Sequence, residues 1–575
     1  MITAGLKLTQ SGGIALLNDN RLEFNIEMQK LANGARYSNV DELDDLVTVM
    51  SDFGFQLGDI AKWAVDGWDG AENGRVSLLS GGAPTELLVA PYRETAKVPD
   101  PGLPGLSGQL VIGGKSMDYE SYVHVAGHLA SAYCTSPFAR RGEPSMVLVW
   151  DGGCFPRLYC VDADGRIEAG GGAFPLIGHT YSMTSQYWGP FKRQHKSSHV
   201  DDLSVAGKMM AYIALGTVRE EIKSVLREEF FQYFEADSAR VRKYRETIIG
   251  CGSTGEKSHA YVHQYLTAVQ QSTAVLGVAD EDVLASVHEF LEELLIDRVT
   301  AKIQAWKGGG QWNLCFAGGC ALNIKWNSAL RAHPTIKAMW VPPFPDDSGV
   351  AIGTACLAAA GGEGLRPIEW GTRLGPRLEP TTDVPQGWSV APCTAEELAQ
   401  TIHTTGKAVV VLNGRAELGP RALGGRSILA PATDGTMKKL LNDVKSREHY
   451  RPVAPICLEE HAPTIFDPGT PDPYMLFEHW VRPEWIDRVP AIMHLDGTAR
   501  LQTVNETDDP NLHAILREYY RCSGIPVLCN TSANYNGRSF FPDVASAMEW
   551  GRLDLVWSEG VLYSRSGENA LGGEL

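Results

Sequence analysis

The chain has 575 residues, of which 44% are hydrophobic and 21% are charged, so it has ordinary globular composition and room for two or more domains. Its formal net charge of -18 argues against general attraction to nucleic acid or to an anionic membrane, so any anion site must be local. No signal peptide and no membrane span is expected from the apolar pattern. The eleven cysteines form no Cys-x-x-Cys pair, which favours reduced thiols in a cytoplasmic protein.

The first part of the chain predicts strands and helices that alternate after an opening β-meander. In chain order we expect strands over 3–8, 14–17 and 21–26, a helix over 41–57, a strand over 60–65, irregular Gly- and Pro-rich structure over 80–117, a helix over 122–133, and strands over 146–150 and 158–161. Beyond these we expect charged helical structure over 218–245, a long amphipathic helix over 281–306, a strand over 314–317, a loop over 341–349 and an Ala-rich helix ending at 360.

A change of composition marks a domain boundary. Residues 361–392 carry Gly and Pro with little periodicity, which predicts a linker over 366–390. The first domain would then cover 1–365 and the second 391–575. The second would begin with a helix over 394–403 and a buried strand over 408–412.

Two histidines in the first domain have the spacing of metal ligands. His124 and His128 stand four residues apart, so both imidazoles project from one face of the predicted helix. Asp151 at a strand end and Asp346 or Asp347 in a turn could add carboxylates. Such a set suits Fe(II), Mn(II) or Zn(II) better than Mg(II). The alternative is two unrelated histidines on a core-facing helix.

Glycine turns follow several of the predicted strands. They occur at Gly12-Gly13, at Asp151-Gly-Gly153 and at Gly318-Gly-Cys-Ala-Leu-Asn323. Each could present backbone N–H groups to a phosphate, although a single such turn is more often a hairpin. In this order and spacing they resemble the ASKHA superfamily, which includes acetate and sugar kinases, Hsp70 and actin.

A segment rich in cations characterises the second domain. Glu417-Leu-Gly-Pro-Arg-Ala-Leu-Gly-Gly-Arg-Ser427 follows the buried strand, and Lys445-Ser-Arg-Glu-His-Tyr-Arg451 comes soon after it. Arg421, Arg426, Lys445 and Arg451 could converge on one anion, since guanidinium groups match phosphate and carboxylate oxygens in pairs. A solvated basic face is the alternative. It fits less well, because Gly, Pro and Leu separate these charges.

Together these segments resemble the NodU/CmcH family of O-carbamoyltransferases, over nearly the whole chain. The matching segments are Gly5-Leu-Lys-Leu-Thr9, His124-Val-Ala-Gly-His128, Val149-Trp-Asp-Gly152, Gly207-Lys-Met-Met-Ala211, Ala317-Gly-Gly-Cys-Ala-Leu-Asn323, Phe344-Pro-Asp-Asp-Ser-Gly349, Gly419-Pro-Arg-Ala-Leu-Gly-Gly-Arg-Ser427, Arg451-Pro-Val-Ala-Pro455, His494-Leu-Asp-Gly-Thr-Ala-Arg500 and Cys529-Asn-Thr-Ser532. The resemblance implies an α/β protein with an N-terminal ASKHA domain, similar to the tRNA threonylcarbamoyladenosine transferase, and a C-terminal YrdC-like α/β domain.

The resemblance also implies a reaction in two halves. The YrdC-like domain would combine carbamoyl phosphate with ATP to give carbamoyl-adenylate, with Mg(II) possible as the partner of ATP. The first domain, with its metal, expected as Fe(II), would then transfer the carbamoyl group to a hydroxyl. That hydroxyl is expected on a sugar of a glycosylated natural product or a Nod-factor-like molecule. No partner among nucleic acids or membranes is expected, and the sequence leaves the oligomeric state open, with a homodimer as one option.

Residue roles follow from the same resemblance. The pocket for carbamoyl phosphate and ATP would use Arg421, Lys445, Arg451, Arg500, Asn530 and Ser532. The metal ligands would be His124, His128, Asp151 and Asp347. The adenylate would bind Gly318, Gly319 and Asn323, with Lys208 near its phosphate.

One departure from the family leaves a role unassigned. Many members have His-Asp-Gly or His-Asp-Ala after the first strand, whereas this chain has Gln10-Ser-Gly-Gly13. The base that deprotonates the acceptor is therefore not identified. Acceptor specificity is expected in residues 80–117 and 181–199.

Four alternatives to O-carbamoyl transfer fit the sequence less well. A sugar or small-molecule kinase of the ASKHA type would leave the second domain without a role. A hydrogenase-maturation carbamoyltransferase would carry an acylphosphatase module and Cys-x-x-Cys pairs, and a tRNA-modifying enzyme would need a basic face. A non-catalytic nucleotide sensor is disfavoured by the full set of cations and metal ligands.

Overall fold

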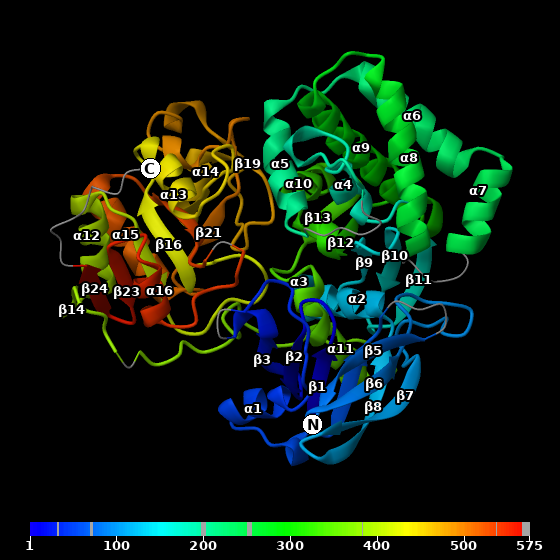
Figure 1. Cartoon of the computed structure of the whole chain (residues 1–575), viewed down its shortest axis with the longest axis horizontal. Coiled ribbons are helices and arrows are strands. Elements are labelled where there is room, and N and C mark those ends of the chain that lie inside the picture. The colour runs from blue at the N-terminus through cyan, green and yellow to red at the C-terminus, as the bar shows by residue number, and fades with distance from the viewer. Residues whose placement is uncertain are drawn as a thin grey trace. The chain divides into compact units, whose positions relative to one another are not determined.

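The protein is a mixed α/β molecule made of two compact units (Figure 1). The structure, a computed structural model, describes residues 1–31, 34–68, 73–196, 203–249, 256–381, 383–535 and 537–565. One unit contains residues 1–28 and 37–371, and the other contains 29–36 and 372–575. The division at 371 falls within the expected linker. The assignment of residues 29–36 to the second unit was not expected from the sequence.

A six-stranded sheet in the order β3-β2-β1-β4-β8-β7 opens the first unit. Its strands are β1 Ile2–Lys7, β2 Gly13–Asn18, β3 Arg21–Glu27, β4 Lys62–Asp66, β7 Leu106–Ile112 and β8 Lys115–Tyr122. The first three form the expected antiparallel meander, and β4 pairs with β1 in parallel.

The region 80–117 is not irregular, which corrects the sequence-based expectation. It holds strand β6 (Ala83–Val89), which pairs with β5 (Gly74–Ser80), as well as β7 and the start of β8. Buried Leu87 and Val89 alternate with exposed Glu86 and Leu88, which is the pattern of a half-buried strand. The Gly and Pro residues that suggested a loop lie mainly between these strands.

A second sheet repeats the plan of the first. Its order is β11-β10-β9-β12-β13, with strands β9 Ser145–Val149, β10 Arg157–Val161, β11 Ile167–Gly172, β12 Trp312–Ala317 and β13 Ile336–Trp340. Again a meander of three antiparallel strands is followed by strands that pair in parallel.

Two helices connect the sheets of this unit. Helix α11 (Val350–Ala360) packs on β1, β2 and β4, helix α2 (His124–Cys134) packs on β9 and β12, and the two helices pack on each other. Every residue of α2 is buried. The helices approach closely at two glycines, because a Cβ on Gly353 would lie 1.8 Å from the carbonyl oxygen of Gly127.

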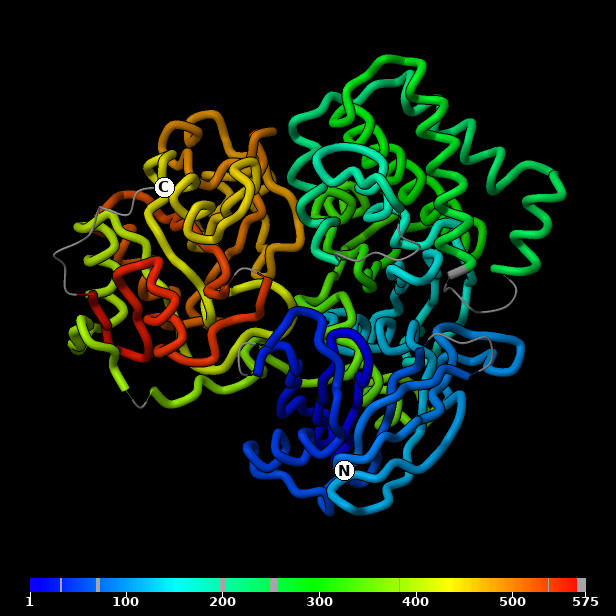
Figure 2. The backbone as a smooth tube through the Cα atoms, viewed as in Figure 1, coloured from blue at the N-terminus to red at the C-terminus, as the bar shows by residue number. Residues whose placement is uncertain are grey.

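Most other helices of this unit come between β11 and β12 in the sequence. They are α4 His179–Thr184, α5 Val205–Tyr212, α6 Glu220–Phe230, α7 Ala239–Tyr244, α8 Glu256–Ala274 and α9 Asp280–Lys307, with α1 Asp45–Asp52, α3 Pro137–Arg140 and α10 Ile324–Ala332 elsewhere. Helix α6 packs against both α8 and α9, as the backbone trace shows (Figure 2). Helix α1 is shorter than expected at both ends, and Gly54, at φ 85°, turns the chain just after its C-terminal end.

The second unit is built on an eight-stranded mixed sheet in the order β14-β24-β23-β15-β16-β22-β17-β21. The strands are β14 Trp388–Pro392, β15 Val409–Leu412, β16 Arg426–Pro431, β17 Ala454–Leu458, β21 Gln502–Val504, β22 Val527–Ser532, β23 Leu555–Ser558 and β24 Val561–Arg565. A small sheet contains β18 Phe466–Asp467, β19 His479–Val481 and β20 Thr498–Ala499. The helices are α12 Ala395–Thr405, α13 Thr436–Val444, α14 Ala462–Ile465, α15 Pro510–Ser523 and α16 Val544–Trp550.

Across the described ranges, no helix combines the length and the apolar character that a bilayer crossing requires.

Candidate active sites

Four side chains that were expected to bind a metal come together in the first unit. His124 and His128 lie on α2, Asp151 follows β9, and Asp347 lies in the turn before α11. One potential ligand atom from each lies within 4.8 Å of all the others. The Nε2 atoms of the two histidines are 3.2 Å apart, and each is 3.4 Å from Oδ1 of Asp347. All four side chains are buried.

A second layer of contacts orients this cluster. Oδ2 of Asp66, at the end of β4, lies 2.8 Å from Nδ1 of His124. The Nζ atom of Lys7, at the end of β1, lies 3.2 Å from the same carboxylate and 3.5 Å from Asp347. Because Nδ1 of His124 faces Asp66, Nε2 is the ring atom directed at the cluster. Sequence reasoning missed Asp66 and Lys7, although each is a polar residue that ends an apolar strand.

The two carboxylates of the cluster are ionised by their surroundings. Burial opposes ionisation, but the charges of Lys7 and His124 hold the pKa of Asp347 well below its usual range. Asp151 accepts hydrogen bonds from the hydroxyl of Tyr92 and from the backbone N–H of Gly319, the latter at 2.7 Å. Burial, and then the charge of Asp151, raise the pKa of Tyr92 well above its usual value, so it remains a donor.

The arrangement fits a bound transition-metal ion. Two imidazole nitrogens and two carboxylates point at one buried centre, where several lone pairs would otherwise face one another. Two nitrogen donors with two oxygen donors are typical of Fe(II), Mn(II) or Zn(II) sites, and Mg(II) prefers oxygen alone.

The glycine turn after β12 lies directly against this cluster. Gly318 has φ 92°, and a Cβ there would lie 2.4 Å from the carbonyl oxygen of Trp150, so only glycine fits. Its neighbour Gly319 donates to Asp151. Asn323 instead serves its own helix, because its Oδ1 accepts from the N–H groups of Lys325 and Trp326 at 3.2 and 3.3 Å. Lys208 lies half-buried on α5, a helix that packs on α4 and α9.

The glycine-rich cationic loop of the second unit, residues 417–427, is stabilised by hydrogen bonds to one of its own side chains. The carboxylate of Glu417 is fully buried, and its Oε1 accepts from the N–H groups of Leu423 at 2.8 Å and Arg426 at 3.0 Å. It also accepts from Gly425 N–H. Arg421 therefore lies within a loop whose C-terminal end is fixed by hydrogen bonds.

Several cations gather around this loop. Burial, and then the charges of Arg421, Arg447 and Arg451, lower the pKa of Arg500 well below its usual value. Burial, followed by Arg447, Arg36 and Arg451, does the same for Lys445. Neighbouring cations that lower one another's pKa values are an arrangement that a bound anion would stabilise. Arg447 was not among the expected binding residues, although the Lys445-x-Arg447 spacing places it beside one.

Arg426 does not share this role. Its guanidinium donates to the carbonyl oxygens of Asn413 at 3.4 Å and Gly425 at 2.9 Å, and its side chain is 1% exposed. Burial lowers its pKa to about 10, and the charged groups that also affect this pKa are Glu417, Arg373 and Glu559. The idea that Arg426 joins the other cations is therefore not supported by the contacts it makes.

Lys445, Asn530 and Arg500, which were also expected in this pocket, differ in the hydrogen bonds that they make. Lys445 directly follows α13, and its side chain donates to the carbonyl oxygens of Ser532 at 2.6 Å and Asn534 at 3.0 Å, at the end of β22. Asn530 donates to Gln502 Oε1 at 2.7 Å, while its own Oδ1 is buried without a hydrogen-bond partner among the described residues. Nε of Arg500 is also buried without one there. An acceptor and a donor thus remain for a ligand.

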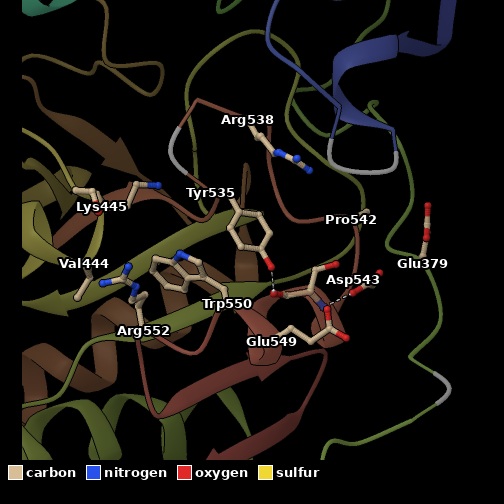
Figure 3. A pocket seen from close by; sticks show the side chains of 12 residues that line it. Glu379, Val444, Lys445, Tyr535, Arg538, Pro542, Asp543, Glu549, Trp550 and Arg552 are labelled. Carbon is tan, nitrogen blue, oxygen red and sulfur yellow. Dashed lines mark hydrogen bonds between the residues drawn. The ribbon is translucent and has the colours of Figure 1, made fainter. Parts of the chain in front are cut away.

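A cavity of about 910 Å³ opens beside Lys445 (Figure 3). Tyr535 and Trp550 lie at its centre, and Arg538, Asp543 and Arg552 also line it. The Tyr535 hydroxyl donates to the carbonyl oxygen of Ser546 at 3.2 Å, which fixes the ring. A cavity of this size, with aromatic and charged walls, can hold a nucleotide-sized molecule.

Comparison with known proteins identifies the family. A sequence model described as carbamoyltransferase N-terminus matches residues 3–98 and 110–356, and one described as carbamoyltransferase C-terminus matches 399–565. The chain belongs to the carbamoyltransferase family. This confirms the resemblance noted in the sequence and makes the protein a transferase of carbamoyl groups.

Relatives within the carbamoyltransferase family align over nearly the full length. The chain is 50% identical to Nodulation protein U of Rhizobium tropici over 568 residues, covering 98% of this chain and 96% of the relative. It is 48% identical to Nodulation protein U of Bradyrhizobium diazoefficiens, covering 98% of each. It is 30% identical to the 3'-hydroxymethylcephem-O-carbamoyltransferase of Streptomyces clavuligerus, covering 97% of this chain and 98% of the relative.

Proposed function

We propose that this carbamoyltransferase is an ATP-dependent O-carbamoyltransferase that works in two half-reactions at two sites. The observation that carries the proposal is the presence of two separate clusters of unlike chemistry. One is a group of cations beside a nucleotide-sized cavity, and the other is a buried set of two histidines and two aspartates.

The first half-reaction would take place in the second unit, as a YrdC-like domain. Carbamoyl phosphate, ATP and one water would give carbamoyl-adenylate, pyrophosphate and orthophosphate. Arg421, Arg451 and Arg500 would offset the repulsion between the two phosphorylated substrates and the charge that develops on pyrophosphate. Asn530 could accept from the carbamoyl NH₂ through the buried Oδ1 atom. The cavity beside Lys445 is large enough for the nucleoside of ATP.

The second half-reaction would take place in the first unit, as an ASKHA-type domain. The order β3-β2-β1-β4-β8 recurs as β11-β10-β9-β12-β13, and this repeated plan supports the assignment. The acceptor oxygen would form a bond to the carbamoyl carbon as the bond to AMP breaks, and the acceptor proton would leave to a base. Gly318 and Gly319 would lie against the adenylate, beside the ligand cluster.

His124, His128, Asp151 and Asp347 would hold a divalent ion, which we propose to be Fe(II). When bound, the ion would supply Lewis-acid polarisation of a carbamoyl or phosphate oxygen. Asp66 and Lys7 would keep His124 and Asp347 in place. Tyr92 would hold Asp151.

The acceptor is proposed to be a hydroxyl of a small molecule, on a sugar of a glycosylated natural product or of a Nod-factor-like molecule. The names of the relatives support this: one is an O-carbamoyltransferase of a 3'-hydroxymethylcephem, and the others are nodulation proteins. His199 and its neighbours, where part of the specificity was expected, lie outside the described residues.

Release of pyrophosphate from ATP tests the proposal without knowledge of the acceptor. The purified protein is incubated with Mg·ATP, with and without carbamoyl phosphate, and both pyrophosphate and ADP are measured. We expect pyrophosphate only when carbamoyl phosphate is present. Formation of ADP with a sugar added, and no pyrophosphate, would instead support a kinase of the ASKHA type.

A further inference from the structure

Lys30 is buried in the second unit although it lies near the start of the chain. It ends the 3₁₀ turn η1 (Met28–Lys30), which directly follows β3. Its side chain donates to the carbonyl oxygens of Glu417 at 2.6 Å and Gly419 at 2.7 Å. The ammonium also lies 5.3 Å from the centre of the Phe540 ring. A buried ammonium is tolerated only where such partners replace water.

Residues 34–36 also make contacts within the second unit. The N–H group of Ser539 donates to the carbonyl oxygen of Gly34 at 3.1 Å, and Nε of Arg36 donates to the carbonyl oxygen of Arg538 at 3.3 Å. Ala35 forms an antiparallel bridge with Arg538. These contacts lie next to the cavity that Arg538 and Lys445 line. The segment therefore belongs to the structure of the anion site and is more than a connection between strands.

The contacts of Lys30 complete the support of the loop that carries Arg421. Glu417 and Gly419 stand at the entry of this loop, and the Glu417 carboxylate fixes its exit at Leu423 and Arg426. Gly419 has φ 81°, so the chain turns sharply two residues before Arg421. The entry is thus held by Lys30 from outside the loop, and the exit is held by Glu417 from within it.

We propose that Lys30 is a positioning residue of the anion site: it fixes the carbonyl groups of Glu417 and Gly419 and so places the Arg421 guanidinium for its anion. This inference rests on the proposed function only for the identity of the anion, a phosphorylated substrate. It implies that the site in the second unit is incomplete without residues from the first 36.

Substitution of Lys30 tests the proposal with kinetics of pyrophosphate release. Lys30→Met keeps the length of the side chain and removes the donor, whereas Lys30→Arg keeps a cation. We expect Lys30→Met to lower kcat for carbamoyl-phosphate-dependent pyrophosphate release about 10- to 100-fold, because catalysis falls steeply when a group moves by about 1 Å. Lys30→Arg should restore part of this loss.

Lys62 provides a matched control. It also donates to a backbone carbonyl, that of Ala358 at 2.8 Å, but in the first unit. Lys62→Met should leave the kinetics of pyrophosphate release unchanged. Equal losses in Lys30→Met and Lys62→Met, with equal thermal midpoints, would overturn the proposal. So would wild-type kinetics in a folded Lys30→Met protein.

A double-mutant cycle separates positioning from general stability. If Lys30 acts through Arg421, adding Lys30→Met to Arg421→Ala should lower kcat for pyrophosphate release little further. If the two residues act independently, the fold-losses in kcat of the single variants should multiply in the double variant.

The binding of inorganic pyrophosphate, measured by calorimetry, compares the same variants without turnover. We expect Kd to rise about tenfold in Lys30→Met and in Lys30→Gln, and unchanged affinity in both would contradict the inference. Since this readout needs no carbamoyl phosphate, it stays decisive even if the adenylation half-reaction is disproved.

Discussion

The His124 ring is directed into its cluster by one hydrogen bond, from Nδ1 to Asp66. Asp66 lies at the end of β4, where the strand delivers it beneath α2, and it is 4% exposed. Such carboxylate–histidine pairs fix both the tautomer and the orientation of a ligand. The affinity for a metal should therefore depend on Asp66 although it is not itself a proposed ligand.

Asp66→Asn tests this dependence. The amide keeps the shape but loses the charge that Nδ1 of His124 and Nζ of Lys7 face, so metal affinity should fall about 10- to 100-fold. Iron retained after dialysis against a competing chelator measures it. Asp118→Asn is the control, because Asp118 is exposed and its carboxylate accepts a hydrogen bond from Gln109. Equal retention in both variants would contradict the role of Asp66.

His288 should make stability depend on pH. It is buried on α9, its ring stacks on Trp326 at 5.4 Å, and its Nε2 lies 3.1 Å from Nδ2 of Asn323. Burial lowers its pKa to about 3, so the folded state keeps it neutral. The unfolded state binds the extra proton below pH ~6.5, so the free energy of unfolding should fall as pH drops from there toward 3.

Urea unfolding of the wild type and of His288→Phe measures this effect. Between pH 7 and pH 5 the contribution of one such histidine is about 2 kcal/mol, which the wild type should lose and His288→Phe should not. The exposed His403 serves as control, because His403→Phe should keep the wild-type slope. The same slope in all three proteins would show that His288 is protonated in the folded state.

At the scale of elements, the contact between α2 and α11 places the ligand cluster. Helix α2 carries His124 and His128, and α11 follows Asp347. The two helices approach through Gly127 and Gly353. Any side chain at position 353 must push them apart, because the atom it meets is backbone.

Gly353→Ala should destabilise the protein by about 2–3 kcal/mol and weaken metal retention at the same time. Gly207→Ala is the matched control. Gly207 lies in helix α5, where a Cβ would meet nothing within 4 Å, so alanine should leave stability unchanged or raise it by about 0.5–1 kcal/mol. The thermal midpoints and the iron content of the two variants test whether the close contact at Gly353 is needed. Equal midpoints would contradict the close contact.

Many elements could be predicted from the sequence where hydrophobic periodicity or a glycine turn is strong. The long helix expected over 281–306 is α9, and the Ala-rich helix that ends at 360 is α11. The strands in 80–117 were missed, because Gly and Pro in the turns obscured short alternating runs. The positions of Asp66 and Lys30 could not be predicted, since each depends on a partner distant in the sequence.

For the whole molecule, the sequence predicted two domains with different chemistry, and the structure has two units with different clusters. The approximate boundary could be seen in the Gly- and Pro-rich stretch near 371. The inclusion of residues 29–36 in the second unit could not, because local patterns do not reveal which unit a short segment joins. The roles proposed for the two clusters are independent in one respect: only the second unit should be needed to make carbamoyl-adenylate.

Pyrophosphate release in two single variants tests this division of labour most directly. Asp347→Ala removes a proposed metal ligand, and Arg421→Ala removes a cation of the anion site. With carbamoyl phosphate and Mg·ATP but no acceptor, we expect Asp347→Ala to release pyrophosphate at close to the wild-type rate and Arg421→Ala to release it at least 100-fold more slowly. If both folded variants lose pyrophosphate release to the same extent, the two clusters do not carry separate half-reactions, and the account is wrong.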